Sequence, residues 1–358
     1  MELVQENIFL LEMRSLLYRG ALDKLTCSPY IICMDAEIQE LNNVLSLLKV
    51  KASCVDFKQN QHQQVYDLSL KFPGKVKDIE KFSAEIALAL KKNSKPTISP
   101  VYNKGIVQLE FFNQVKDVPN ILDYTIENTE DLQCLVGHDY AGNNILFDIK
   151  KAPHTIISGT TGSGKSVLLH VIIANLIVKD IELSLLDPKG IEFSDYKPYF
   201  TNTILHSVPK MISFMTAMVD EMEVRFSSYT KNNKPIVIVI DEFADILAQD
   251  HTDQFRKLIC RLAQKSRAAN MHLIMATQRP SASMVDSDIK ANFPARIACK
   301  TASVVDSRLI LNQPGAEKLF GRGDAYIHDN DHCMQRFQSC FVDPKDTIKY
   351  LMAEKIAS

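Results

Sequence analysis

Residues 159–166 read GTTGSGKS and match the phosphate-binding pattern G-x-x-x-x-G-K-[ST] at every defined position. An apolar run at 154–158 comes before this stretch, and a largely apolar run at 167–174 follows it. The pattern therefore stands between a predicted strand and a predicted helix, which is the context that phosphate binding requires. The alternative is a glycine-rich turn with an incidental lysine, and the flanking strand and helix argue against it.

Each residue type in this loop has a chemical reason to be there. The glycines permit tight backbone turns that aim N–H groups at phosphate oxygens, and the start of the helix adds partial positive charge. We expect Lys165 to reach the β- and γ-phosphates of ATP, and the Ser166 hydroxyl to bind Mg²⁺. The predicted nucleotide-binding residues are Gly159, Thr160, Thr161, Gly162, Ser163, Gly164, Lys165, Ser166 and Val167.

A second chemical element follows another apolar run, at 236–240. Asp241 and Glu242 come directly after it, and the run is typical of a buried parallel strand. Open α/β sheets bind ligands at the carboxyl edge, so we predict Asp241 as a Mg²⁺ ligand and Glu242 as the residue that polarises the attacking water. The alternative is a helix cap formed by two acids. Gln278 ends a further predicted strand at the same edge, where it would sense the γ-phosphate or, alternatively, be a polar turn residue.

Overall composition limits the class of protein. The 358 residues are 46% hydrophobic and suffice for about two folded domains. With 41 Lys and Arg against 43 Asp and Glu, net charge does not indicate a nucleic-acid partner, so any DNA contact must come from local loops. No apolar run reaches the ~18 residues that span a bilayer, and we expect a soluble cytoplasmic protein.

The cysteines do not suggest a disulfide framework or a zinc site. Eight of them are scattered without a C-x-x-C pair, which is typical of reduced cytoplasmic thiols. His328, His332, Cys333 and Cys340 lie close together near the end of the chain. We interpret residues 328–332 as a polar hairpin tip and not as a zinc site.

Hydrophobic periodicity divides the chain into three predicted regions: 1–60, 61–131 and 132–358. Residues 1–60 are largely helical in pattern with a break near 28–33, and they either cover a core or engage a membrane or transfer-machinery partner. Residues 61–131 suggest a small α+β domain followed by a linker. Residues 132–358 alternate strand and helix patterns, which predicts an α/β fold with a doubly wound parallel sheet.

Together these residues resemble the motor of the FtsK/SpoIIIE family, within the FtsK–HerA class of P-loop ATPases with a RecA-like fold. The resemblance covers roughly 65–122 and 132–343, and 65–122 resembles the small domain that forms a second ring tier. No counterpart of the family's membrane anchor or winged-helix module is recognised. The matching stretches are GTTGSGKSV at 159–167, LDPKGIEFSDY at 186–196, VIDEFADIL at 239–247, LAQKSRAANMHLIMATQRPS at 262–281, IKANFPARIA at 289–298 and DSRLILNQPGAEKLFGRGDAYI at 306–327.

The resemblance implies a homo-oligomeric ring, expected to be a hexamer, around double-stranded DNA. ATP would lie between subunits, and an arginine from the neighbour would complete each site. The candidates for this arginine are Arg267 and Arg279, with Arg308 weaker, and each is alternatively an ordinary surface arginine. The DNA-contact candidates are Lys189, Lys290, Asn292 and Arg322, for which simple solvation is the alternative.

The leading hypothesis is an ATP-driven translocase of double-stranded DNA that uses Mg²⁺. A related motor that drives protein export through a secretion system is the main alternative. A nucleotide-switched scaffold is disfavoured because it would not need a base at Glu242. A small-molecule kinase is disfavoured because no lid or acceptor motif is recognised.

Overall fold

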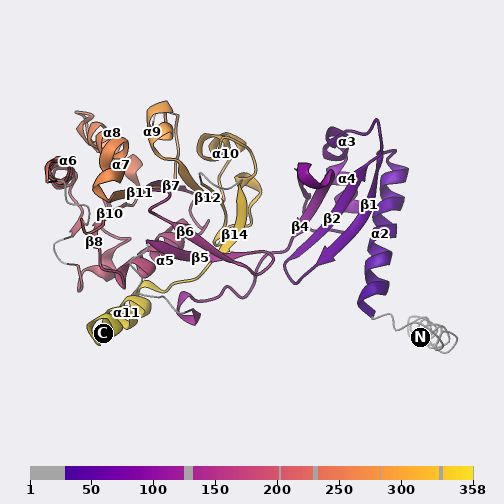
Figure 1. Cartoon of the computed structure of the whole chain (residues 1–358), viewed down its shortest axis with the longest axis horizontal. Coiled ribbons are helices and arrows are strands. Elements are labelled where there is room, and N and C mark those ends of the chain that lie inside the picture. Colours follow the sequence, from indigo (N-terminus) through magenta and orange to yellow (C-terminus); the bar gives the residue numbers. More distant parts are fainter. Residues whose placement is uncertain are drawn as a thin grey trace. The chain divides into compact units, whose positions relative to one another are not determined.

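The computed structural model describes residues 29–124, 132–200, 203–228, 233–282, 284–329 and 334–357. The chain divides into two compact units between Asn113 and Gln114 (Figure 1). This division differs from the three predicted regions, whose boundaries lay at 60/61 and 131/132. The first helical pattern, near the N-terminus, lies outside the described residues.

The first unit is an antiparallel sheet with helices packed on a shared core. Its sheet has four strands in the order β1-β2-β4-β3. Leu41 and Leu45 from the first helix, and Ile79 and Ile86 from the next two, meet strand residues such as Tyr66 in one buried cluster. The elements are α2 (Pro29–Leu47), β1 (Ala52–Gln59), β2 (Gln63–Leu70), α3 (Val76–Lys81), α4 (Ser83–Ala89), β3 (Thr97–Val101), η1 (Tyr102–Lys104) and β4 (Ile106–Phe112).

Two features of this unit were missed by the sequence patterns. The predicted break near Pro29 was wrong from Pro29 onward, because α2 begins there, and a proline's fixed φ and missing N–H are tolerated at the start of a helix. Strand β1 was not predicted, yet it pairs with β2 and buries Cys54 and Phe57 in the shared core. Its pairing is why the sheet unit begins well before residue 61.

The second unit is built on a ten-stranded sheet in the order β6-β5-β14-β13-β12-β7-β11-β10-β8-β9. The strands from β12 to β9 in this order are parallel to one another, whereas β5, β6, β13 and β14 pair antiparallel. The strands are β5 (Gln133–Asp139), β6 (Asn144–Asp148), β7 (His154–Ser158), β8 (Glu182–Leu186), β9 (Ile204–Leu205), β10 (Ile236–Ile240), β11 (Met271–Thr277), β12 (Ala295–Cys299), β13 (Asp324–His328) and β14 (Gln335–Ser339).

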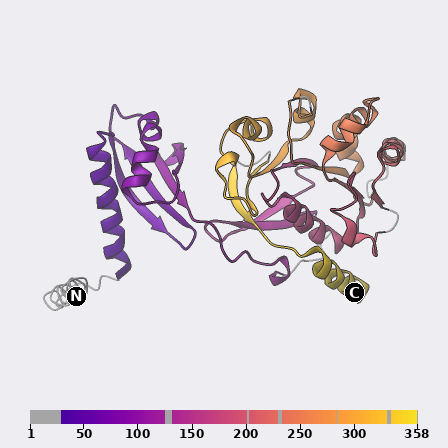
Figure 2. The same cartoon turned by 180° about the vertical axis from the view of Figure 1, so that it is seen from behind.

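Helices cover both faces of this sheet, so the predicted doubly wound α/β fold is confirmed. Helices α5 and α11 share one core with the sheet, and α6, α7, α8, α9 and α10 share the core on the opposite face (Figures 1 and 2). The helices are α5 (Lys165–Ile177), α6 (Val208–Ser227), α7 (Phe243–Gln249), α8 (Gln254–Lys265), α9 (Ser287–Asn292), α10 (Val304–Leu311) and α11 (Pro344–Ala357), with the short helices η2 (Ile121–Asp123), η3 (Ser194–Tyr196), η4 (Ser266–Ala269) and η5 (Ala316–Lys318).

Burial on both faces explains the continuous apolar strands. Along β10, Ile236, Ile238 and Ile240 enter the core under α6 to α10, while Val237 and Val239 enter the core under α5. A strand buried on both faces has no polar alternation. The sequence pattern of β10 therefore follows from its central place between β11 and β8.

Residues 114–124 belong to the second unit, although they were predicted as a linker. Ile121 is fully buried in its core, and its N–H donates to the Phe341 carbonyl at 3.0 Å. This hydrogen bond links residues 114–124 to the segment that follows β14. Residues 125–131 lie outside the described part of the chain.

Two absences concern the described residues alone. None of the described helices is long and apolar enough to cross a membrane. Within the same residues no group of three or more His, Cys, Asp or Glu side chains could hold a metal ion. His332 and Cys333, which the sequence placed in the hairpin tip, lie outside the described residues.

Candidate nucleotide-binding site

The carboxyl ends of the parallel strands bring together the residues predicted to bind nucleotide. The phosphate loop follows β7, which stands between β12 and β11, and Asp241 follows β10 on the other side of β11. Thr277 ends β11 between them. Ligands of open α/β sheets bind at this edge, so the topology alone places the loop and the acids in one site.

The phosphate loop has a fixed course because other strand ends bind its backbone. Gly162 and Gly164 adopt φ of +76° and +99°, which side chains disfavour, and Gly164 lies directly before α5. The Gly323 N–H donates to the Ser163 carbonyl at 2.8 Å, and the Thr160 N–H donates to the Lys300 carbonyl at 2.9 Å. These bonds preorganise the loop at the N-terminus of α5, where backbone N–H groups favour an anion.

Lys165 and Asp241 form a buried ion pair at the centre of the site. Lys165 Nζ lies 2.5 Å from Asp241 Oδ1, and each residue is 3% exposed. Burial raises the pKa of the Asp241 carboxyl, while the Lys165 ammonium opposes this shift. The pair lies at the start of α5, where Lys165 directly precedes Ser166, the predicted Mg²⁺ ligand.

Glu242 is held in an uncommon backbone conformation and has its own hydrogen-bond partners. Its φ is +46°, and it caps α7. The Thr277 hydroxyl donates to Glu242 Oε1 at 2.7 Å, and the Gln278 N–H donates to Oε2 at 3.0 Å. The end of β11 therefore orients the predicted base. Thr277 was not predicted as a site residue, although it directly precedes the predicted Gln278.

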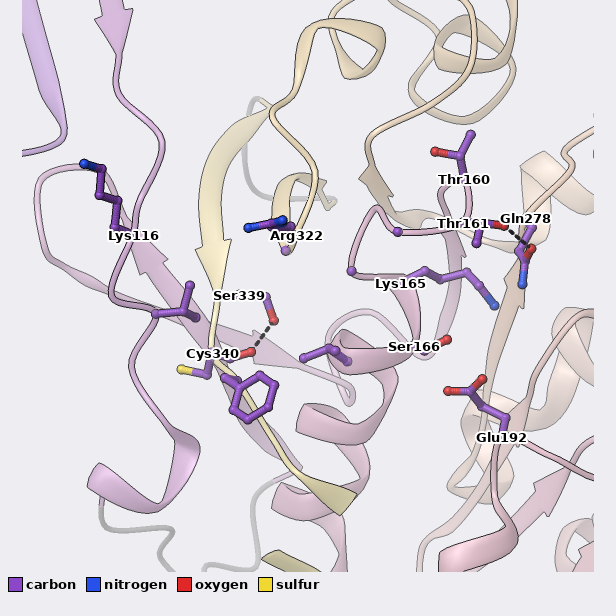
Figure 3. Close-up of a pocket in the computed structure, with 16 residues that line it drawn as sticks. Lys116, Thr160, Thr161, Lys165, Ser166, Glu192, Gln278, Arg322, Ser339 and Cys340 are labelled. Carbon is purple, nitrogen blue, oxygen red and sulfur yellow. Dashed lines mark hydrogen bonds between the residues drawn. The ribbon is translucent and has the colours of Figure 1, made fainter. Parts of the chain in front are cut away.

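A cavity of about 640 Å³ opens over the phosphate loop (Figure 3). Its volume lies within the roughly 300–1,000 Å³ typical of small-molecule sites. Apolar members of its lining include Val118, Cys340 and Phe341, and the Phe341 N–H donates to the Pro119 carbonyl at 2.9 Å. The lining residues are Lys116, Val118, Thr160, Thr161, Gly162, Gly164, Lys165, Ser166, Val167, Glu192, Gln278, Arg322, Gly323, Ser339, Cys340 and Phe341.

Some residues of the predicted site line this cavity, together with others that were not predicted. The Thr161 hydroxyl donates to Gln278 Oε1 at 3.1 Å, so Gln278 lies against the phosphate loop. Arg322 lines this cavity, where its own N–H donates to the Gly162 carbonyl at 3.2 Å, and its predicted DNA contact stays a prediction. Glu192 and Phe341 line it too, and no pattern in the sequence identified them.

The donor set fits ATP with Mg²⁺. The loop offers backbone N–H groups and Lys165 to phosphates, and Ser166 and Asp241 offer the hard oxygen ligands that Mg²⁺ prefers. Few protein ligands are expected for Mg²⁺, because it keeps several waters and binds substrate phosphates.

Other predicted residues lie away from the cavity. Exposed Arg267 is in η4, before the start of β11 and hence at the opposite edge of the sheet from the phosphate loop. Lys290 and Asn292 are in α9, and Arg308 is in α10. Exposed Arg279 stays near the site, since its N–H donates to the Thr277 hydroxyl at 3.2 Å.

Lys189 is already paired with an acid in this structure. Its ammonium lies 3.2 Å from Asp245 on α7, and both side chains are more than two-fifths exposed. The predicted DNA contact by Lys189 stays a prediction.

The fold, the phosphate loop and the acids after β10 define a P-loop ATPase. A family model for the FtsK/SpoIIIE family matches residues 123–231 and 227–282. Residues 123–282 thus belong to a domain of the FtsK/SpoIIIE family.

Proteins described as DNA translocase FtsK are similar to most of this chain. The one from Borreliella burgdorferi is 32% identical over an alignment of 360 positions. This alignment covers 90% of this chain and 45% of the relative. The one from Corynebacterium glutamicum is 30% identical over 353 residues, which cover 87% of this chain and 38% of the relative. The chain thus spans less than half the length of these curated relatives.

Solved structures share the fold. The monomer form of the pCW3 conjugation coupling protein TcpA with ATPγS has a TM-score of 0.63 and 24% identity, with coverage of 88% of this chain and 99% of TcpA. The cytoplasmic domain of the Thermomonospora curvata type VII secretion ATPase EccC has a TM-score of 0.54 and 22% identity, with coverage of 63% of this chain and 31% of EccC.

Proposed function

We propose that this chain is a Mg²⁺-dependent ATPase motor that moves double-stranded DNA as a ring of its own copies, with six as the expected number. The observation that carries the proposal is the convergence of Lys165, Asp241 and Glu242 at the edge of the sheet. Similarity to relatives described as DNA translocases supports DNA as the substrate.

The residues of the site have separate roles in this proposal. The loop and Lys165 bind the phosphates of ATP, and Ser166 and Asp241 hold Mg²⁺, which neutralises phosphate charge when bound. Glu242, oriented by Thr277 and Gln278, accepts a proton from the attacking water. The apolar part of the cavity lining near Phe341 receives the adenine base.

Arg267 suits a role on a neighbouring subunit. It is exposed and stands before β11, one strand length of about 20 Å away from its own phosphate loop. It therefore cannot contact nucleotide in its own subunit, but a ring could present it to the next site. Arg279 is the second candidate. The role of Arg267 is tested by mixing Arg267→Ala subunits with Glu242→Gln subunits and measuring whether neighbouring subunits restore hydrolysis to one another.

Lys290 and Asn292 on α9 stay our candidates for DNA contact. Desolvation and the nearby charge of Arg296 lower the pKa of Lys290. Such contacts to backbone phosphates carry no sequence information. We expect Lys290→Ala to raise the DNA concentration that gives half-maximal stimulation, without changing hydrolysis in the absence of DNA.

The decisive experiment is steady-state ATP hydrolysis by the full chain, with and without long double-stranded DNA. Strong DNA stimulation that disappears in Glu242→Gln supports the proposal. Robust hydrolysis that is indifferent to DNA contradicts the DNA part and favours the protein-export alternative. Absence of ATP binding contradicts the nucleotide part as well.

A further inference from the structure

The loop after β8 places the carboxylate of Glu192 in the nucleotide cavity. The buried side chain of Asp187 fixes the backbone course of this loop. Asp187 is fully buried. Its Oδ1 accepts the N–H groups of Lys189 at 3.0 Å and Gly190 at 2.9 Å, and its Oδ2 accepts that of Phe193 at 3.2 Å. Gly190 supplies the turn with φ of +69°. Because Phe193 is buried in the core, its neighbour Glu192 is directed toward the cavity.

Glu192 contacts the first two turns of α5. Its carboxylate lies 3.1 Å from His170 Nε2 and beside the Ser166 hydroxyl. Ser166 and His170 are one helical turn apart, so a single side chain spans both. Figure 3 shows Glu192 beside Ser166, close to the phosphate loop.

A buried pair behind Glu192 fixes its orientation. His170 Nδ1 and the Tyr196 hydroxyl are 2.9 Å apart, their rings stack, and they are 5% and 0% exposed. One tautomer satisfies all three groups, with Nε2–H donating to Glu192 and Nδ1 accepting from Tyr196. The carboxylate is therefore held from the core side, while its other side faces the cavity.

The charge of Glu192 is unexpected in a cavity that binds phosphates. The Glu192 side chain is 24% exposed and lines the cavity, so its carboxylate is accessible to a ligand there. A carboxylate repels phosphate oxygens unless a cation lies between them. Glu192, the Ser166 hydroxyl beside it and Asp241, whose carboxylate pairs with Lys165, offer hard oxygen atoms of the kind that Mg²⁺ prefers.

We propose that Glu192 is a further anchoring residue of the magnesium–nucleotide site, positioned by Asp187 and by the His170–Tyr196 pair. The proposal rests on the proposed function and deepens it. It makes the stretch DPKGIEF, between β8 and η3, part of the metal site. In this proposal, the loop after β8 contacts the magnesium–nucleotide bound in the cavity.

Equilibrium binding of ATP to the full chain tests this proposal, with Mg²⁺ and then with EDTA. In Glu192→Gln we expect equal or tighter binding in EDTA, because a negative charge has been removed. The gain in affinity that Mg²⁺ provides should fall by about 10- to 100-fold, the usual effect of losing a group that supports a metal. Manganese affinity in the presence of ADP, measured by electron paramagnetic resonance, should fall by a similar factor.

Two further variants make the test specific. Asp195→Asn changes an exposed acid of the same loop and should leave the Mg²⁺ gain unchanged. Glu192→Asp keeps the charge and should retain part of the gain. A Glu192→Gln variant with a wild-type Mg²⁺ gain overturns the proposal, as does equal weakening of ATP binding in Mg²⁺ and in EDTA. Failure of the wild-type chain to bind ATP instead overturns the proposed function.

Discussion

The Thr277 hydroxyl donates to Glu242 Oε1 at 2.7 Å across the ends of two neighbouring parallel strands. Glu242 is 3% exposed and has a left-handed φ, so it depends on this partner and on the Gln278 N–H for its orientation. The end of β11 thus controls the residue that would activate water. Gln278 also lines the cavity, so a ligand that contacts Gln278 would lie one residue from the hydroxyl that orients Glu242.

We expect Thr277→Val to slow ATP hydrolysis while leaving the KM for ATP nearly unchanged. Valine keeps the shape but removes a hydrogen bond to a charged group, worth about 1.5–3 kcal/mol. A decrease in kcat of roughly tenfold to 100-fold should follow, measured by steady-state kinetics. Thr277→Ser, which keeps the hydroxyl, is the matched control. Equal kcat values in the valine and wild-type chains would contradict this role for Thr277.

Glu242→Gln should bind ATP as tightly as the wild-type chain but hydrolyse it at least about 100-fold more slowly. The amide has nearly the same shape, yet it cannot accept a proton from water. Nucleotide binding and turnover, measured on the same preparation, separate the two effects. Normal hydrolysis by this variant would rule out Glu242 as the base.

Phe341→Ala should weaken ATP binding by roughly tenfold, because stacking between a base and an aromatic ring contributes about 1–3 kcal/mol. Phe341 is 45% exposed and lines the cavity together with Val118 and Cys340. Inhibition by inorganic triphosphate, which has no base, is the matched measurement and should not change. A parallel loss of triphosphate binding would show that Phe341 acts on the cavity as a whole.

The sequence predicted those parts of the site that are contiguous in the chain. The phosphate loop and the Asp241–Glu242 pair each occupy a short stretch after an apolar strand, so local pattern and sheet topology were sufficient. Glu192 was missed because its direction depends on Asp187, whose hydrogen bonds to later backbone N–H groups leave no periodic pattern. Phe341 was missed because its place depends on pairing with residues 119–121, far away in the sequence.

The fold, like the site, was predicted only where a local sequence pattern was sufficient. The central parallel strands were predicted because burial on both faces produces continuous apolar runs. Strands β13 and β14 were indicated only by the hairpin tip predicted between them, since Asp324 and Arg336 interrupt any apolar pattern. These two form a buried bidentate pair, with Nε to Oδ1 at 3.0 Å and Nη2 to Oδ2 at 2.7 Å. Only the tertiary partner explains how such polar residues fit into a buried sheet.

Acid should destabilise the second unit through two buried histidines at the beginnings of β7 and β11. Burial lowers the pKa of His154 to about 3 and that of His272 to about 4, and the nearby positive charge of Arg267 adds to both shifts. His154 Nε2 and His272 Nδ1 have no hydrogen-bond partner among the described residues, which suits neutral rings. Unfolded histidine has a pKa near 6.5, so the unfolded chain binds more protons than the folded chain below that pH.

The stabilisation from these neutral histidines is therefore complete above pH 6.5 and is lost as the pH falls toward 4. Well below pH 6.5 the free energy of unfolding should decrease by about 1.4 kcal/mol per pH unit for each histidine. This slope is measured by urea unfolding of the full chain at a series of pH values from about 7.5 to about 5. The double variant His154→Gln, His272→Gln should show a shallower slope over the same range. An equal slope in the double variant and the wild-type chain would mean that other groups control the response to acid.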